Sequence, residues 1–202
     1  MLVRYALILA LGAILVSGVA LSRQKQPPAD PADAIPTKEI HSSRAIVQKF
    51  SETLQAALHQ AMETGGPVNG IAVCHDKAGQ IATDLSAEAD MIVGRTSLKL
   101  RNANNAPDNW ELAVLKQFDA RHAQGEPAEK LEYFAVIDDD QGQKTFRYMK
   151  AIPTASPCLK CHGETIDSDV ETKLKELYPE DKARGYKEGE LRGAFTLSKP
   201  LP

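Results

Sequence analysis

Residues 131–152 read LEYFAVIDDDQGQKTFRYMKAI, and this stretch decides the fold class. Its two ends, Leu131–Ile137 and Lys144–Ile152, are rich in β-branched and aromatic residues, and the polar segment Asp138–Gln143 separates them. Two such runs joined by a short polar turn predict a β-hairpin. The same signals predict two further strands, at Ile92–Leu100 and Leu191–Leu197. We therefore expect an antiparallel sheet.

Two long helices are expected before the sheet. From Lys38, apolar residues recur at helical spacing, at Ile40, Val47, Phe50, Leu54, Ala57 and Ala61. Gly65, Gly66 and Pro67 should end this helix. A second helix should run from Val68 to Leu85, with an inner face made of Ile71, Cys74, Ala78, Ile81 and Leu85. This pattern places Cys74 in the middle of a buried face.

A third helix should follow Pro107, because Asp108 and Glu111 match a capping box. Its inner stripe is expected to consist of Leu112, Leu115 and Phe118. A short helix is also expected at Val170–Leu177. Helices that precede an antiparallel sheet indicate an α+β domain.

The sequence Cys158-Leu159-Lys160-Cys161-His162 matches the pattern for c-type haem attachment. Two thiols at this spacing can add to the two vinyl groups on one edge of the porphyrin. The adjacent His162 then supplies a proximal nitrogen to the iron. Two alternatives are a Cys₃His zinc site that includes Cys74, and a dithiol redox pair. Cys74 has no second ligand at zinc-knuckle spacing, and a free dithiol in an oxidising compartment would tend to close into a disulfide.

The N-terminus carries an export signal. Arg4 precedes an uncharged, mostly apolar run from Tyr5 to Leu21 with small residues near its end. Residues 1–22 are therefore a secretory signal peptide or, alternatively, a membrane anchor formed by residues 5–21. Residues 23–37 contain four prolines and form a tether, which leaves 38–202 as the domain. Both alternatives place the domain outside the cytoplasm, as expected for a periplasmic protein.

Composition excludes some classes of partner. The 202-residue chain has a formal net charge of −3, with 43% hydrophobic and 25% charged residues, which is ordinary for a globular protein. No basic stripe interleaved with aromatics is present, so we expect no nucleic-acid partner. We expect contact with a membrane only through the N-terminal segment.

A second axial ligand, if the iron has one, must come from upstream of the haem motif, because no His, Met or Cys follows His162. The candidates are His41, His59, Met62, Cys74, His75, Met91, His122 and Met149. Cys74 differs from the others because it lies on the expected inner face of a helix. It is also the third cysteine of an exported chain, left without a partner once Cys158 and Cys161 are assigned to the haem motif. The alternative is that Cys74 is simply a small buried hydrophobic residue.

Four segments carry a further likeness, and they are Ala72–Ala82, Gly94–Glu111, Cys158–Gly163 and Tyr178–Ala194. Together they resemble a family of small monohaem c-type proteins with a PAS-like haem domain, described in cyanobacteria and widespread in bacteria. The resemblance implies one covalent haem c with His/Cys axial ligation, in which Cys74 is the partner of His162. It also implies a PAS-like antiparallel sheet flanked by N-terminal helices in a single domain.

Several polar residues in these segments could serve the haem. Arg95, Arg101 and Asn102 are candidates for binding the propionates, because an arginine fork suits a carboxylate. A structural ion pair with Asp or Glu is the alternative. Tyr186 and Arg192 either lie near the haem edge or pack the last strand.

An iron with two strong protein ligands has no open position, which argues against an enzyme and favours one-electron transfer. We therefore expect a carrier that exchanges electrons with a redox partner protein, which the sequence does not identify. A haem-based redox or gas sensor for CO or NO, signalling through a separate partner, is the alternative. A PAS-like fold suggests sensing only by analogy.

Overall fold

The computed structural model describes residues 36–138 and 142–202. Its elements are α1 (Thr37–Ala89), β1 (Ile92–Thr96), η2 (Ala103–Asn105), α2 (Asn109–Ala123), η3 (Ala128–Lys130), β2 (Glu132–Asp138), β3 (Lys144–Pro153), η4 (Ser156–Cys158), α3 (Leu159–His162), α4 (Ser168–Leu177) and β4 (Leu191–Pro200). The expected signal segment and all but the last two residues of the tether lie outside the described residues. Within the described ranges, no helix combines the length and the apolar character that crossing a membrane requires.

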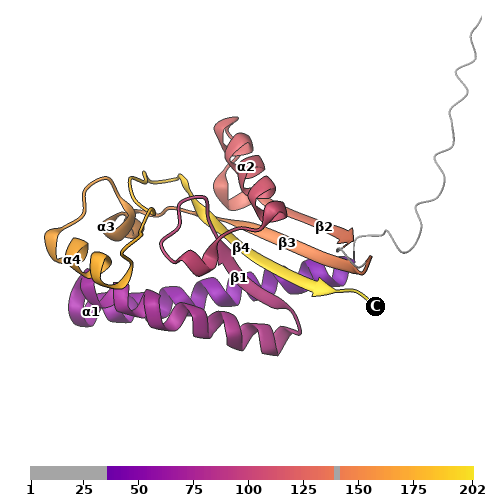
Figure 1. Ribbon diagram of the computed structural model, residues 1–202, viewed down its shortest axis with the longest axis horizontal. Helices are drawn as coiled ribbons and strands as arrows, with labels where there is room; N and C mark the ends of the chain where they lie inside the picture. The colour runs from indigo at the N-terminus through magenta and orange to yellow at the C-terminus, as the bar shows by residue number, and fades with distance from the viewer. Residues whose placement is uncertain (1–35, 139–141) are drawn as a thin grey trace, which may run out of the picture.

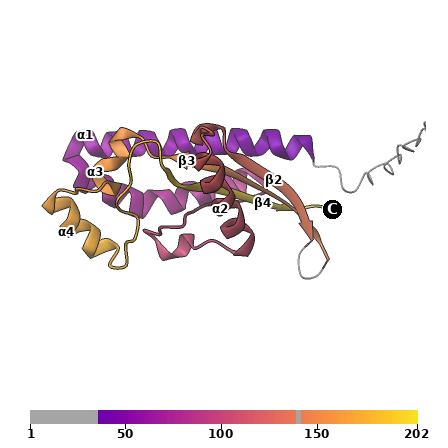
Figure 2. The ribbon, with the colours of Figure 1, turned by 90° about the horizontal axis from the view of Figure 1, so that it is seen from above.

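A four-stranded antiparallel sheet forms the middle layer, with the strand order β1-β4-β3-β2. Figure 1 shows α1 below this sheet and α2 above it. In Figure 2, which looks down from above, α2 lies nearest to the viewer and α1 lies behind the strands. The α+β class, the antiparallel sheet and the single domain are thus confirmed.

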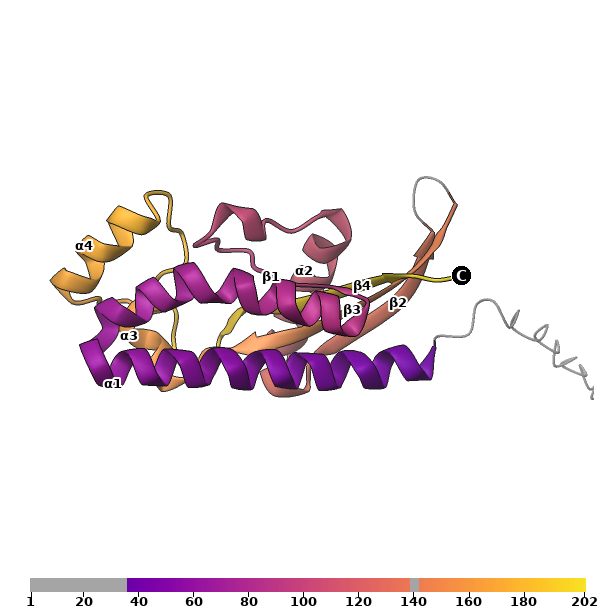
Figure 3. The same ribbon diagram turned by 90° about the horizontal axis from the view of Figure 1, so that it is seen from below.

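Two helices make up α1, as the sequence predicted. Gly65 and Gly66 have non-helical backbone angles, and Pro67 follows them. Gly66 has φ 67°, a left-handed conformation that glycine adopts without strain. The two halves consequently run antiparallel and side by side under the sheet, as Figure 3 shows from below. The bend lies at the end of the molecule where α3 and α4 are also found (Figure 3).

Both faces of the sheet carry buried apolar side chains, because residues along each strand point alternately to the two faces. On β3, Phe146 and Tyr148 face α1, whereas Met149 and Ala151 face α2. The α1 side also contains Ile46, Val47, Phe50, Leu85, Met91, Val93, Phe195 and Leu197. The α2 side also contains Val114, Leu115, Phe118, Leu131 and Ala194. These two layers fix the sheet on which the candidate site is built.

The structure corrects two details of the sequence prediction. Strand β1 ends at Thr96 rather than Leu100, because the Ser97 hydroxyl donates to the Arg192 carbonyl and the chain turns there. On α2, Val114 is buried whereas Leu112 is only half-buried. The helix is rotated so that Glu111 faces the sheet, where its carboxylate accepts hydrogen bonds from Arg147 and Thr196.

The ring of Phe50 should be among the main contributors to stability. It is fully buried, packs against Phe195 at a tilt of 54° with a centroid distance of 5.2 Å, and lies under the Arg95 guanidinium. We expect Phe50→Ala to lower the free energy of unfolding by about 3–5 kcal/mol, since it leaves a cavity in a closely packed layer. Denaturant unfolding of the purified protein measures this change. Gln55→Ala, at an exposed position of the same helix, should change it by less than about 0.5 kcal/mol.

Candidate haem site

The two motif cysteines lie on consecutive short helices. Cys158 ends η4 and Cys161 lies in α3, and both thiols are free and half-buried. Gly163 closes α3 by donating its N–H to the Leu159 carbonyl at 2.9 Å. A Cβ at this position would lie 2.5 Å from the same carbonyl oxygen, so only glycine fits directly after His162.

The imidazole of His162 is held in one tautomer. Its Nδ1 lies 2.8 Å from the carbonyl oxygen of Ala183, which can only accept, so Nδ1 carries the proton. Nε2 is therefore unprotonated, and it accepts from Nε of Arg192 at 3.4 Å and lies 3.4 Å from Nη1 of Arg101. Burial and the two guanidinium charges hold the pKa of His162 well below its ordinary value. A neutral imidazole with an available Nε2 is the form that ligates metals.

Two arginines, Arg101 and Arg192, contact this imidazole and a third, Arg95, lies within electrostatic reach of it, and the partners of the three differ. Arg101 forms a two-point ion pair with Asp181. Arg95 and Arg192 pair with no carboxylate anywhere in residues 36–138 and 142–202. Arg95 only covers the Phe50 ring at 5.4 Å, and Arg192 donates to the Ser97 hydroxyl at 3.2 Å. Burial lowers the pKa of both unpaired guanidiniums.

Cys74 approaches the site from the second half of α1. Its thiol is half-buried, rather than central to a fully buried face as the spacing had indicated. Ile71, one turn earlier, packs with Tyr178 in a cluster that Cys161 also contacts. Burial raises the pKa of the Cys74 thiol, whereas the nearby charges of Arg95, Arg101 and Arg192 act to lower it. Cys74 thus lies within electrostatic reach of the same three arginines.

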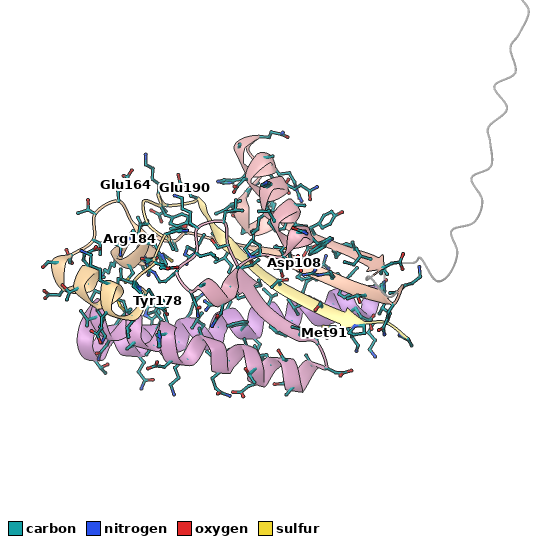
Figure 4. The ribbon with its side chains drawn as sticks, viewed as in Figure 1. Met91, Asp108, Glu164, Tyr178, Arg184 and Glu190 are labelled. Atoms are coloured by element: carbon teal, nitrogen blue, oxygen red, sulfur yellow. The ribbon has the colours of Figure 1, made fainter. Side chains whose placement is uncertain are left out.

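Tyr178 forms part of the wall beside Cys74. Burial, together with the effect of Cys74, raises the pKa of the Tyr178 hydroxyl to about 12. Figure 4 shows Tyr178 and Arg184 at the α3–α4 end of the molecule, whereas Met91 and Asp108 lie toward the strands.

Two comparisons with known proteins bear on this arrangement. The Tll0287-like family model matches residues 32–200. The chain belongs to the Tll0287-like family. Among solved structures, it resembles the crystal structure of the cyanobacterial heme-protein Tll0287, with a TM-score of 0.64 and 22% sequence identity. The match covers 83% of this chain and 98% of the other, and at this identity it supports the fold. No curated protein matches the sequence.

The four segments that carried the resemblance meet in this Tll0287-like chain. Lys182 N–H donates to the Leu100 carbonyl, and Tyr186 N–H donates to the His162 carbonyl. The 178–194 segment therefore joins the residues after β1 to the haem motif. Two groups that sequence reasoning gave no role, Asp181 and the Ala183 carbonyl, come from this segment, as does Arg192, whose contact to His162 agrees with the first of its two expected positions.

Other candidates named from the sequence have different surroundings in this Tll0287-like chain. The Asn102 side chain accepts from Asn104 N–H at 2.9 Å and caps η2. Met91 and Met149 are core residues of the α1 and α2 layers. His122 bonds the Glu126 carbonyl at the end of α2. In the described part of the chain, no three His, Cys, Asp or Glu side chains gather as a metal site, so the four residues of the zinc alternative do not form one.

Proposed function

We propose that this protein binds one haem c, attached covalently to Cys158 and Cys161, with His162 and Cys74 as axial ligands. The observation that carries the proposal is the fixed His162 imidazole, whose Nδ1–H is held by the Ala183 carbonyl so that Nε2 is the unprotonated, ligating nitrogen, and which directly follows the second motif cysteine. The family and the haem named for the related crystal structure support the same conclusion.

The charges of the site also fit a haem. Its two propionates are anions, and Arg95 and Arg192 are largely buried cations with no carboxylate partner among the described residues. An unpaired buried charge is costly, and a carboxylate bound in a two-point geometry offsets that cost. We propose that these two arginines bind the propionates. Asn102, already engaged in its own turn, is a weaker candidate for this role.

The bound haem would supply a one-electron couple. With His162 and Cys74 both committed to the iron, no position is open for a substrate, so we propose a carrier rather than an enzyme. It would act outside the cytoplasm with a redox partner protein, without nucleic acid, and with any membrane contact restricted to the N-terminal segment. The antiparallel sheet with α1 beneath it is consistent with a PAS-like domain.

A redox or gas sensor is the second candidate. Cys74 lies on α1, and this helix pair also covers one whole face of the sheet. A change at Cys74 could therefore reach the surface of the domain through α1, where a separate partner would detect it.

Optical and EPR spectra of the purified holoprotein, with and without CO or NO, distinguish the two candidates. For a carrier we expect a low-spin haem in both oxidation states that binds neither gas within minutes. Rapid gas binding by the ferrous protein would instead favour the sensor. A high-spin haem in the isolated ferric protein would contradict ligation by both His162 and Cys74.

The charge of Arg95 should influence the midpoint potential of the haem. Removing a nearby cation stabilises the ferric state, so Arg95→Gln should lower the potential by on the order of 50 mV. Spectroelectrochemical titration measures this shift. Arg121→Gln removes the same charge at the far end of α2, where Arg121 pairs with Glu126, and should change the potential much less. Equal shifts in the two variants would exclude a specific role for Arg95.

A further inference from the structure

A basic surface lies beside the haem motif. Residues 97–101 and 182–187 together contain five lysines and arginines and no aspartate or glutamate, whereas the whole chain has a net charge of −3. The two stretches are neighbours, because Lys182 N–H donates to the Leu100 carbonyl at 2.7 Å. Figure 4 places Arg184, a member of the second stretch, at the α3–α4 end of the molecule. We call the two stretches together the haem-side basic surface.

Two of the five cations on this surface are unpaired. Lys99 and Lys182 are exposed, and in the part of the chain that the structure describes neither lies within ion-pair distance of a carboxylate. The other three already have a carboxylate partner, and they are Arg101, Arg184 and Lys187. The positive charge that remains for an outside partner is therefore that of Lys99 and Lys182.

An exposed apolar side chain accompanies these charges. Leu98, directly before Lys99, is 42% exposed, and Ile92 is the one other large hydrophobic residue in the described ranges that is exposed. A single exposed leucine needs no partner by itself, but this one lies next to unpaired charge. Protein interfaces combine an apolar centre with a polar rim, and complexes between redox proteins bury little area. The haem-side basic surface thus has the composition of a small, transient docking site.

Tyr186 connects this surface to the proximal ligand. Its side chain is buried, and Nζ of Lys99 lies 4.7 Å from the centroid of its ring. The same ring meets the His162 imidazole edge-on, with a centroid distance of 6.2 Å and an interplanar angle of 86°, which is a direct aromatic contact. Electron tunnelling weakens steeply with distance. A partner bound over Lys99 would be separated from the iron ligand by this one packed ring.

We infer that the haem-side basic surface is where the redox partner docks, and that the partner presents an acidic patch beside its own one-electron centre. Lys99 and Lys182 attract that patch, Leu98 packs at the contact, and Tyr186 bridges the contact to His162. One electron passes from the ferrous iron to the oxidised centre of the partner, which is reduced, and no bond forms or breaks. The inference rests on the proposed function as an electron carrier.

Anionic and cationic one-electron oxidants test the charge of this surface. Stopped-flow oxidation of the ferrous holoprotein is followed with ferricyanide, an anion, and with hexaammineruthenium(III), a cation. At an ionic strength of about 0.1 M, charges farther than about 10 Å from the reagent are largely screened, so the rate constant reports local charge. We expect the double variant Lys99→Glu/Lys182→Glu to react about tenfold more slowly with ferricyanide, the lower end of electrostatic steering, and faster with the ruthenium complex.

The double variant Lys38→Glu/Lys116→Glu is the matched control. It makes the same change in net charge at two exposed lysines, one at the start of α1 and one on α2, that also lack a carboxylate partner among the described residues. Both rate constants should stay within about twofold of wild type. Damage to the fold cannot produce the pattern expected for Lys99→Glu/Lys182→Glu, because it would not slow one reagent and speed the other.

NMR spectroscopy supplies a readout that does not depend on electron transfer. Hexacyanochromate(III) has the charge and shape of ferricyanide, but it does not oxidise the protein, and its paramagnetism broadens the signals of amides near which it binds. We expect broadening at the amides of Lys99 and Lys182 in isotope-labelled ferrous holoprotein, and none at Lys116.

Two results would overturn the inference. They are equal rate changes in the two double variants, or broadening centred on another face while residues 97–101 and 182–187 keep sharp signals. A wild-type holoprotein without a reversible one-electron couple would instead refute the proposed function itself.

Discussion

Replacing both Cys158 and Cys161 by alanine should abolish retention of the haem after acid-acetone extraction. Thioether bonds survive denaturation, whereas the axial bonds to His162 and Cys74 do not, so wild-type holoprotein should keep its colour in the protein pellet. Intact mass spectrometry should show one haem added to each wild-type chain and none in the double variant. The loss is expected to be complete because the two thiols are the only proposed covalent links.

The fold should survive this double replacement. Both cysteines are half-buried and free, and no disulfide depends on them. Each single variant should retain haem through one thioether, and Cys74→Ala should retain it through two. If haem extracts freely from wild-type protein, or if the wild-type mass equals that of the chain alone, c-type attachment is wrong.

Much of the fold could be predicted because its signals are local. Gly65-Gly66-Pro67 breaks α1 within three residues, and the Asp108–Glu111 capping box starts α2 as expected, with both reciprocal hydrogen bonds formed. The hairpin β2–β3 likewise follows from two β-rich runs and the turn between them. In each case the deciding residues are neighbours in the sequence, so a local pattern is enough to predict the backbone conformation.

The candidate site could be predicted only in part. The cysteines and His162 form a continuous motif, but the groups that orient them come from distant segments. Asp181 lies in a segment that carries the family resemblance, but nothing around it in the sequence indicates that it pairs with Arg101. The Ala183 carbonyl is a backbone atom, so its role depends only on where the 178–186 loop lies. The sequence could not show that Arg101 is paired whereas Arg95 and Arg192 are not, because ion pairing is decided by tertiary packing.

Replacing Cys74 should change the iron more than any other substitution outside the haem motif. We expect wild-type ferric protein to give a low-spin EPR signal with thiolate character. Cys74→Ala should remove this signal and leave a five-coordinate or water-ligated iron. Cys74→Met should preserve six-coordination and raise the midpoint potential, because a neutral thioether stabilises ferric iron less than a thiolate does. The rise should exceed about 59 mV, which is a tenfold change in a one-electron equilibrium.

His75 provides the matched control for this experiment. It follows Cys74 on the same helix, but its side chain is 44% exposed, bonds Asp76 and meets the edge of the Tyr178 ring. Because its imidazole is 44% exposed and is paired with Asp76, His75→Ala should leave the EPR signal and the midpoint potential close to wild type. The opposite pattern, an altered spectrum in His75→Ala and an unchanged one in Cys74→Ala, would mean that the haem is ligated by two histidines. The thiol of Cys74 would then be a packing group, and its position beside three arginines would have no part in setting the potential.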